Sequence, residues 1–120
     1  EKFIKNEKAR RALSSAVLAD GIYAIGGFDG NSYMCQSKNT TLGITNGGNT
    51  SMNVARCTHS SIAIYETQEI YVFGGFDFLP LSSVERYSLI NNEWEKIMDM
   101  PSSRFMHSSV FVKSGNNNIF

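Results

Sequence analysis

The chain has no net charge, few cysteines and no long apolar run, and each absence argues against a class of function. Eleven lysines and arginines balance eleven aspartates and glutamates, so no positive field is available to attract phosphate backbones or anionic lipid. The longest apolar runs, such as residues 70–73, are far too short to span a bilayer. We therefore expect neither nucleic-acid binding nor membrane insertion.

Cysteine occurs only twice, as Cys35 and Cys57. Neither residue belongs to a CxxC pair or has a histidine at metal-ligand spacing. The sequence thus predicts no zinc site and no disulfide framework. Two reduced thiols suit a reducing compartment, so we expect a cytoplasmic protein, with association to the cytoskeleton as one form of that location.

Motifs of catalysis are missing as well. The glycine-rich stretch at residues 26–30 lacks the lysine and the hydroxyl residue of a phosphate-binding loop. The stretch from Asp29 is a poor calcium loop, because its twelfth position is Thr40 rather than a bidentate glutamate. No activated nucleophile or pair of catalytic carboxylates is recognisable. The sequence predicts no enzyme, no catalytic residue, no metal site and no cofactor.

What the chain does contain is an internal repeat. Residues 22–29 recur as residues 70–77, and residues 52–61 recur as residues 100–109, both at a shift of 48. An earlier copy of the second stretch begins at Arg10, at a shift of 46. Because two unrelated stretches share one period, we expect structural repeats that follow one another along the chain.

The composition within one period predicts four strands of different burial. Residues 59–64 are small and β-prone, and residues 69–73 contain a continuous apolar run, which is typical of a strand buried on both faces. Residues 83–89 and 93–97 mix apolar with charged positions and are separated by a hairpin turn at residues 91–92. This order of strands suits one blade of a β-propeller.

These features resemble the kelch repeat, in which an apolar strand ends in a double glycine and is followed by a spaced tyrosine and a spaced tryptophan. Residues 74–75, Tyr87 and Trp94 carry all of these marks. The resemblance implies an all-β fold made of kelch-type β-propeller blades of four antiparallel strands. Tyr87 and Trp94 are then expected to pack between blades.

The first repeat keeps the double glycine at residues 26–27, but a shift of 48 puts Asn39 and Asn46 where tyrosine and tryptophan are expected. We therefore divide the chain into the end of a preceding blade (1–9), a kelch repeat with diverged outer strands (10–55), a complete kelch repeat (56–103) and the truncated start of a third repeat (104–120). Such a set does not close a ring. We expect an incomplete propeller, a fragment that is oligomeric, aggregated or loosely folded by itself.

Histidine and arginine each recur at a fixed position of the repeat, and both residue types invite a functional interpretation. His59 and His107 share a position that Leu13 fills in the first repeat, which favours packing over metal binding or acid–base chemistry. The recurring arginines are Arg10, Arg56 and Arg104. A guanidinium can satisfy carbonyls or carboxylates between neighbouring blades, so we favour a structural clamp, with a binding role as the alternative.

The resemblance also implies where a partner would bind, since known kelch propellers use the loop after the double glycine and the loop that enters the next blade. At these positions we expect partner contacts from Phe28, Asp29, Asn31, Phe76, Asp77, Phe78, Leu79, Arg104, Phe105 and Met106. Cys57 and Thr58 also lie in an entry loop. Large apolar side chains on a rim favour a protein or peptide partner. The alternative is that Phe28 and Phe76 tuck under neighbouring loops.

The sequence thus predicts a non-catalytic module for protein–protein interaction, a scaffold or adaptor that can belong to a larger assembly. The resemblance leaves two alternatives open. One is the substrate-recognition part of a cullin-type ubiquitin ligase adaptor. The other is part of a kelch-like propeller enzyme, such as a copper-radical oxidase or a sugar epimerase, although the tyrosine and histidine cluster that such an oxidase needs is not recognisable.

Overall fold

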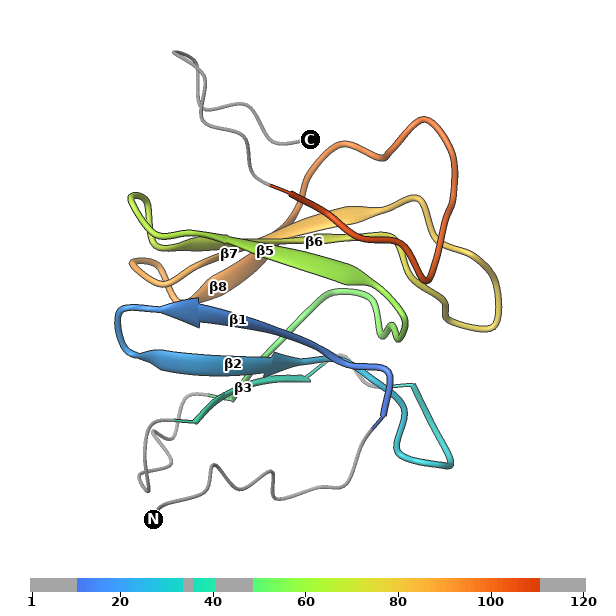
Figure 1. The fold of residues 1–120 in the computed structure, drawn as a ribbon, viewed down its shortest axis with the longest axis horizontal. Helices are drawn as coiled ribbons and strands as arrows, with labels where there is room; N and C mark the ends of the chain where they lie inside the picture. The colour runs from blue at the N-terminus through green and yellow to red at the C-terminus, as the bar shows by residue number, and fades with distance from the viewer. Residues whose placement is uncertain (1–10, 34–35, 41–48, 111–120) are drawn as a thin grey trace.

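The computed structural model describes residues 11–33, 36–40 and 49–110, and within them every regular element is a β-strand (Figure 1). Four strands form a first antiparallel sheet, blade 1, in the order β1 (Ser14–Leu18), β2 (Gly21–Ile25), β3 (Gln36–Thr40) and β4 (Asn49–Ser51). Four more form blade 2, in the order β5 (Ser60–Ile64), β6 (Glu69–Phe73), β7 (Val84–Ser88) and β8 (Glu93–Lys96). None of the described residues forms a helix that could span a membrane.

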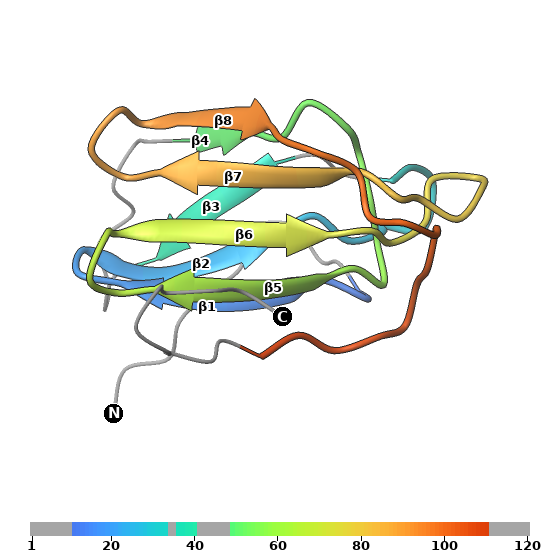
Figure 2. The same cartoon turned by 90° about the horizontal axis from the view of Figure 1, so that it is seen from above.

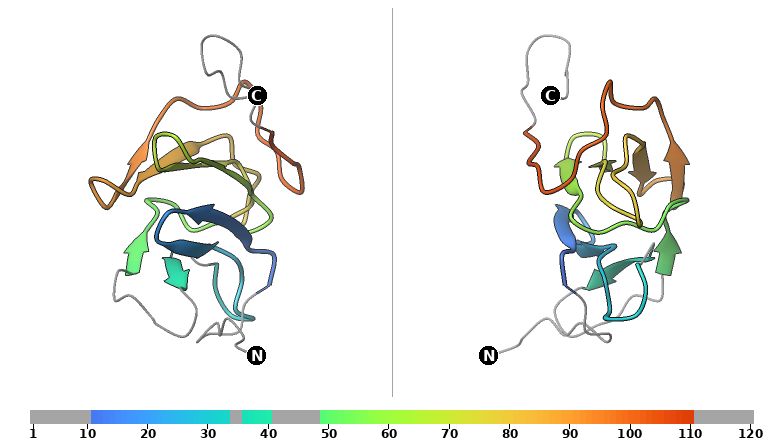
Figure 3. Two further views of the ribbon diagram at one scale, coloured as in Figure 1. Left: turned by 60° about the vertical axis from the view of Figure 1, so that its left-hand side comes forward. Right: turned by 90° about the vertical axis from the view of Figure 1, so that its right-hand side faces the viewer.

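The two blades stack face to face, so that their first strands lie next to each other and their last strands lie next to each other. β5 lies against β1 and β8 against β4 (Figure 2). The side views show the blades as two successive layers, each with its first strand on one side and its last strand on the other (Figure 3). Two layers related in this way do not form a closed ring. The predicted all-β fold of four-stranded blades in an incomplete propeller is therefore confirmed.

The core of the molecule lies between the blades. Tyr23 and Ile25 of β2, together with Ile70 and Val72 of β6, are almost completely buried in one apolar cluster. Fully burying an aliphatic side chain of this size stabilises the fold by about 1.5–3 kcal/mol. The interface between blades, rather than either sheet alone, therefore provides most of the apolar stabilisation.

Tyr87 and Trp94 complete this core, as the sequence predicted. The Tyr87 ring lies 5.4 Å from the Trp94 ring and 5.4 Å from the ring of Tyr23 in the other blade. The indole Nε1 of Trp94 donates a hydrogen bond of 3.3 Å to Thr50 Oγ1 in β4. Both residues therefore connect the outer strands of blade 2 to blade 1.

Two predictions about the strands are corrected by the register. β2 pairs Ile22 with Thr40, just as β6 pairs Ile70 with Tyr87, so Thr40 and not Asn39 is the counterpart of the tyrosine. The run at residues 69–73 is fully buried on one face only, because Tyr71 and Phe73 on the other face are half-buried. Asn46 and the segments 1–9 and 111–120 lie outside the described residues.

Candidate functional site

The double glycines fix the position of the loops at one rim of the blades. Gly26 and Gly74 both have positive φ, and a Cβ on either would lie 2.6 Å from a backbone carbonyl oxygen, that of Arg56 or Arg104. The next glycine of each pair donates its amide hydrogen to the same carbonyl at 2.8 Å. Only glycine allows this approach. Each entry loop is thereby held against the loop that follows the preceding double glycine.

Short reciprocal backbone pairs extend this arrangement. Arg11 and Phe28 exchange two hydrogen bonds of 2.9 Å, and Cys57 and Phe76 exchange two of 3.1 and 2.9 Å. Both aromatic residues directly follow a double glycine. The two post-glycine loops and the two entry loops at residues 56–58 and 104–106 therefore lie on one rim.

Aromatic rings from both blades form a continuous row along this rim. The centroid of Tyr33 lies 5.1 Å from Phe28 and 5.9 Å from Phe76, and Phe76 lies 5.5 Å from Phe105. Phe78 packs edge-on against Tyr33 at 4.8 Å. We call these five residues the aromatic rim. Tilted and edge-to-face pairs at these separations are the favourable ones.

Tyr33 is the member of the aromatic rim that the sequence analysis missed. It ends the loop that begins at Phe28, and the predicted contacts in that loop stopped at Asn31. An isolated β-bridge joins Phe28 to Tyr33, so the loop folds back and returns Tyr33 to the rim. The sequence signal that could have identified Tyr33 is an aromatic residue a few positions after the double glycine.

The members of the aromatic rim differ in exposure. Phe28 and Phe76 are half-buried. This agrees in part with the alternative prediction that these two side chains lie under neighbouring loops. Phe78 is 76% exposed and Leu79 and Met106 are also largely exposed. The rim thus has a half-buried aromatic floor with exposed apolar side chains around it.

Two of the exposed residues have a backbone conformation that bulky side chains rarely adopt. Phe78 has a φ of 63° and Met106 a φ of 55°. The left-handed region costs a residue with a Cβ roughly 1–2 kcal/mol. Met106 shares this conformation with its counterparts Thr58 (φ 49°) and Ala12 (φ 56°), so there it is a structural feature of the repeat. The strain at Phe78 is of the kind that concentrates at functional sites.

Charged side chains at the rim are few and have mixed sign. The Arg11 guanidinium lies 5.2 Å from the centroid of the Phe28 ring, a cation–π contact. Asp29 Oδ1 accepts hydrogen bonds from the amides of Asn31 at 2.9 Å and Ser32 at 2.8 Å, so this carboxylate shapes its own loop. Asp77 is half-buried, and its amide bonds the Leu79 carbonyl at 3.1 Å. Arg104 is exposed.

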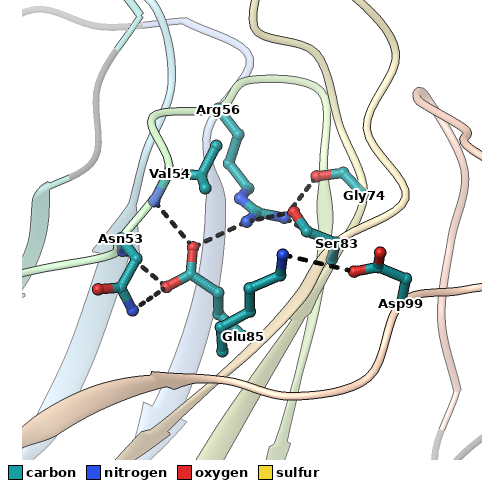
Figure 4. Close-up of polar contacts among 8 residues, drawn as sticks. Asn53, Val54, Arg56, Gly74, Ser83, Glu85 and Asp99 are labelled. Carbon is teal, nitrogen blue, oxygen red and sulfur yellow. Dashed lines mark hydrogen bonds and ion pairs between the residues drawn. The ribbon is translucent and has the colours of Figure 1, made fainter.

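Behind the rim, Arg56 and Glu85 form a fully buried ion pair (Figure 4). Arg56 Nη2 lies 2.8 Å from Glu85 Oε2, and both side chains are 0% exposed. The same guanidinium donates to the carbonyls of Gly74 at 2.8 Å and Ser83 at 3.0 Å, and to Ser83 Oγ at 3.0 Å. Burial lowers the pKa of Arg56, and Glu85 opposes this shift.

Glu85 also binds the segment that connects the blades. Its carboxylate accepts hydrogen bonds from the amides of Asn53 at 2.7 Å and Val54 at 3.0 Å, and from Asn53 Nδ2 at 3.0 Å (Figure 4). Arg56 and Glu85 therefore fix the connecting segment to β6 and β7. Arg56 therefore has the predicted structural role, but the acceptors of its guanidinium all belong to blade 2 and not to two neighbouring blades. Arg10 lies outside the described residues.

The recurring histidines occupy packing positions. A Cβ on Gly26 would lie 2.7 Å from His59 Cε1, and one on Gly74 would lie 3.1 Å from His107 Cε1, so each imidazole covers a glycine of the preceding blade. Burial, reinforced by Arg56, lowers the pKa of His59 to about 4, although the Ile25 backbone opposes the shift. Among the described residues no three histidine, cysteine or acidic side chains gather as metal ligands would.

Comparison with known families identifies one repeat. A family model for the kelch motif matches residues 55–101, which include all of blade 2. The predicted resemblance is confirmed for this part of the chain, and blade 2 is a kelch repeat. No curated protein matches the chain.

Proposed function

We propose that this chain, in which residues 55–101 form a kelch repeat, is a non-catalytic module that binds a protein or peptide partner through its aromatic rim. One observation carries the proposal. Phe78 is 76% exposed, lies in a strained backbone conformation and makes an edge-to-face contact with Tyr33 of the other blade. An exposed phenylalanine in a fixed position is suited to be covered by a partner.

The geometry of the rim supports an apolar anchor in the partner. Phe76 is half-buried between Tyr33 and Phe105 in the row, while Phe78, which contacts Tyr33, and Phe105 are exposed. Aromatic residues in such positions are commonly the ones whose truncation costs more than 2 kcal/mol of binding free energy, by the general experience of alanine scanning. The partner segment that fits best carries a large aliphatic or aromatic side chain.

The charges at the rim argue against a phosphate or a strongly acidic motif. Arg11 contacts Phe28 at one end of the row and Arg104 precedes Phe105 at the other, whereas Asp29 and Asp77 directly follow Phe28 and Phe76 in the sequence. Two arginines and two aspartates leave no net positive charge to attract a dense anion, and they still permit polar contacts around an apolar anchor. The proposed role is that of a scaffold or adaptor.

A location in the cytoplasm belongs to the same proposal. Cys57 is a free thiol that is buried beside Phe76, and burial raises its pKa. A buried neutral thiol is stable in a reducing compartment and is not placed to react.

The proposal is tested by introducing a charged side chain into the aromatic rim. Phe78→Asp should abolish capture of the wild-type partners in a pull-down and leave the melting temperature nearly unchanged. Ile90→Asp is the matched control, because Ile90 is 81% exposed on the turn between β7 and β8. Loss of partners with both variants, or with neither, would contradict binding at the aromatic rim.

A further inference from the structure

Asp77 lies between two residues of the aromatic rim, and its surroundings differ from those of its counterpart in blade 1. That counterpart, 48 residues earlier, is Asp29. The Asp29 carboxylate accepts hydrogen bonds within its own loop, from the amides of Asn31 at 2.9 Å and Ser32 at 2.8 Å. The half-buried Asp77 carboxylate takes part in none of the hydrogen bonds or ion pairs among the described residues.

The residues that follow each aspartate explain this difference. The two loops lie at the same end of the stacked blades (Figure 2). Pro80 stands where Ser32 stands in blade 1, and proline has no amide hydrogen to donate. Phe78 is the counterpart of Gly30, and both have positive φ, 63° and 103°. The apolar loop of blade 2 therefore offers its aspartate fewer donors and places an exposed phenylalanine next to it.

Blade 1 also has a cation at this rim that blade 2 lacks. Arg11 exchanges two backbone hydrogen bonds with Phe28, and its guanidinium lies 5.2 Å from the centroid of that ring. The same reciprocal backbone pair joins Cys57 to Phe76 in blade 2. Cys57 is therefore the structural counterpart of Arg11, and its short side chain brings no positive charge to Phe76.

The Asp77 carboxylate acts electrostatically on the place where this cation is missing. Burial raises the pKa of the Cys57 thiol, the Thr58 hydroxyl opposes this shift, and the Asp77 carboxylate adds to it. The same carboxylate also favours the charged form of Arg56. That guanidinium is already bound within blade 2, with the Glu85 carboxylate 2.8 Å away.

The other arginines at this rim have different contacts. Arg11 lies over the Phe28 ring, and Arg104 Nη2 donates a hydrogen bond of 2.9 Å to Ser102 Oγ. Neither forms an ion pair with Asp77 in the part of the chain that the structure describes. Blade 2 thus presents a carboxylate beside aromatic rings, a combination that is complementary to a cation with an apolar, planar surface.

We propose that the aromatic rim receives an arginine of the partner, whose guanidinium pairs with the Asp77 carboxylate and lies flat against the aromatic rings beside it. The inference rests on the proposed function and specifies the partner segment, which carries this arginine close to its apolar anchor. A guanidinium binds a carboxylate through two parallel N–H groups and stacks on aromatic faces, whereas the lysine ammonium is a strongly hydrated point charge. Arg11 over Phe28 shows the same contact with a ring inside this chain.

The test uses phage-displayed random short peptides as the probe. Peptides are selected on the immobilised protein, and the affinity of a selected peptide is measured by calorimetry. We expect the selected sequences to combine a large apolar residue with an arginine. Replacing that arginine with glutamine should weaken binding about tenfold, because close charge pairs at interfaces contribute at least this much. Replacing it with lysine should recover only part of the affinity.

Asp77→Asn keeps the size of the side chain and removes its charge. The variant should weaken binding of the arginine peptide about tenfold and of the glutamine peptide less than about twofold, which is the coupling expected of a direct pair. Its melting temperature should stay nearly unchanged, since no hydrogen bond of the described chain is lost. Asp99→Asn is the matched control, because Asp99 is 54% exposed and lies near Lys96, and it should bind both peptides like the wild type.

The outcomes separate this inference from the proposed function. Peptides selected for an apolar residue without arginine, or an equal effect of Asp77→Asn on both peptides, would reject the arginine site and leave the binding role of the rim standing. Equal selection of lysine and arginine would reject the contact with the rings. If no peptide is selected, or if Phe78→Asp binds the selected peptides as tightly as the wild type, both the inference and the proposed function are wrong.

Discussion

Tyr33 and Phe78 meet edge-to-face across the two blades, with ring centroids 4.8 Å apart and an angle of 79° between the ring planes. Tyr33 follows β2 of blade 1, and Phe78 follows β6 of blade 2. The contact therefore exists only when both blades are folded and stacked. It gives the rim a surface to which each blade contributes.

Tyr33→Ala should weaken partner binding at least about tenfold, because Phe78 loses the ring that fixes its position. Tyr33→Phe keeps the ring and should bind like the wild type. Titration of a captured partner by calorimetry measures the difference. Equal affinity of the alanine variant would show that Phe78 needs no support from blade 1.

Trp94→Ala should lower the free energy of unfolding by about 3–5 kcal/mol, since it empties the interface between β8 and β4. Phe78→Ala should change it by less than about 0.5 kcal/mol, because its side chain is largely exposed. Thermal and urea unfolding of both variants provide the comparison. Similar losses would mean that the core and the rim were wrongly distinguished.

Glu85→Gln should cost about 3–5 kcal/mol of stability, because Arg56 would keep a buried charge without its counter-ion. Arg86 and Glu95 form the matched exposed pair, with Nη2 and Oε2 2.6 Å apart. Glu95→Gln should cost less than about 1 kcal/mol. Urea unfolding at neutral pH distinguishes the two cases, and an equally small loss for Glu85→Gln would argue against the clamp.

Stability should fall as the pH is lowered from 7 to 4. The folded-state pKa of His59 is about 4, below its ordinary value of 6.5, so the unfolded chain takes up a proton first. The stabilisation from neutral His59 is complete above pH 6.5 and lost towards pH 4, about 3 kcal/mol in all. The pKa of His107 is lowered in the same direction.

His59→Leu tests whether His59 causes this pH dependence of stability. Leucine is a suitable replacement because Leu13 fills the same position in the first repeat. The variant should lose less stability than the wild type between pH 7 and pH 4, as measured by urea unfolding at each pH. An unchanged pH dependence would assign the effect to carboxylates instead.

Gly26→Ala should be much more costly than Gly30→Ala. Both glycines have positive φ, but a Cβ on Gly26 meets the Arg56 carbonyl at 2.6 Å, while one on Gly30 meets nothing within 4 Å. Gly30→Ala should therefore cost only about 1 kcal/mol, from backbone strain. Gly26→Ala should cost about 1–3 kcal/mol more, from steric overlap. Similar melting temperatures would contradict the close approach.

Much of the blade architecture follows from the sequence alone. The shift of 48 places residues 22–29 over residues 70–77, and the double glycines and apolar strands lie at matching positions in the two blades. These features are local, because strand formation and positive φ depend on a few adjacent residues. The packing of Tyr87 and Trp94 between blades was predictable only through the resemblance to the kelch repeat, because it depends on contacts with Tyr23 and Thr50 of the other blade.

Other features were decided by contacts between segments that are distant in the sequence. Glu85 became the partner of Arg56 because β7 brings it beneath the connecting segment, 29 residues further along the chain. Thr40 rather than Asn39 faces Ile22 because β3 pairs one residue out of step with the repeat. Register depends on the sheet as a whole and not on a strand's own residues.

The rim shows the same division between local sequence and tertiary structure. The sequence determined that Phe28, Phe76 and Phe78 follow double glycines, which fixes the loops that carry them. Only the stacked blades decided that Tyr33 joins these rings, and that Arg104 stays exposed while Arg56 is buried. A side chain's exposure depends on which sheet covers it, and that covering sheet comes from another part of the fold.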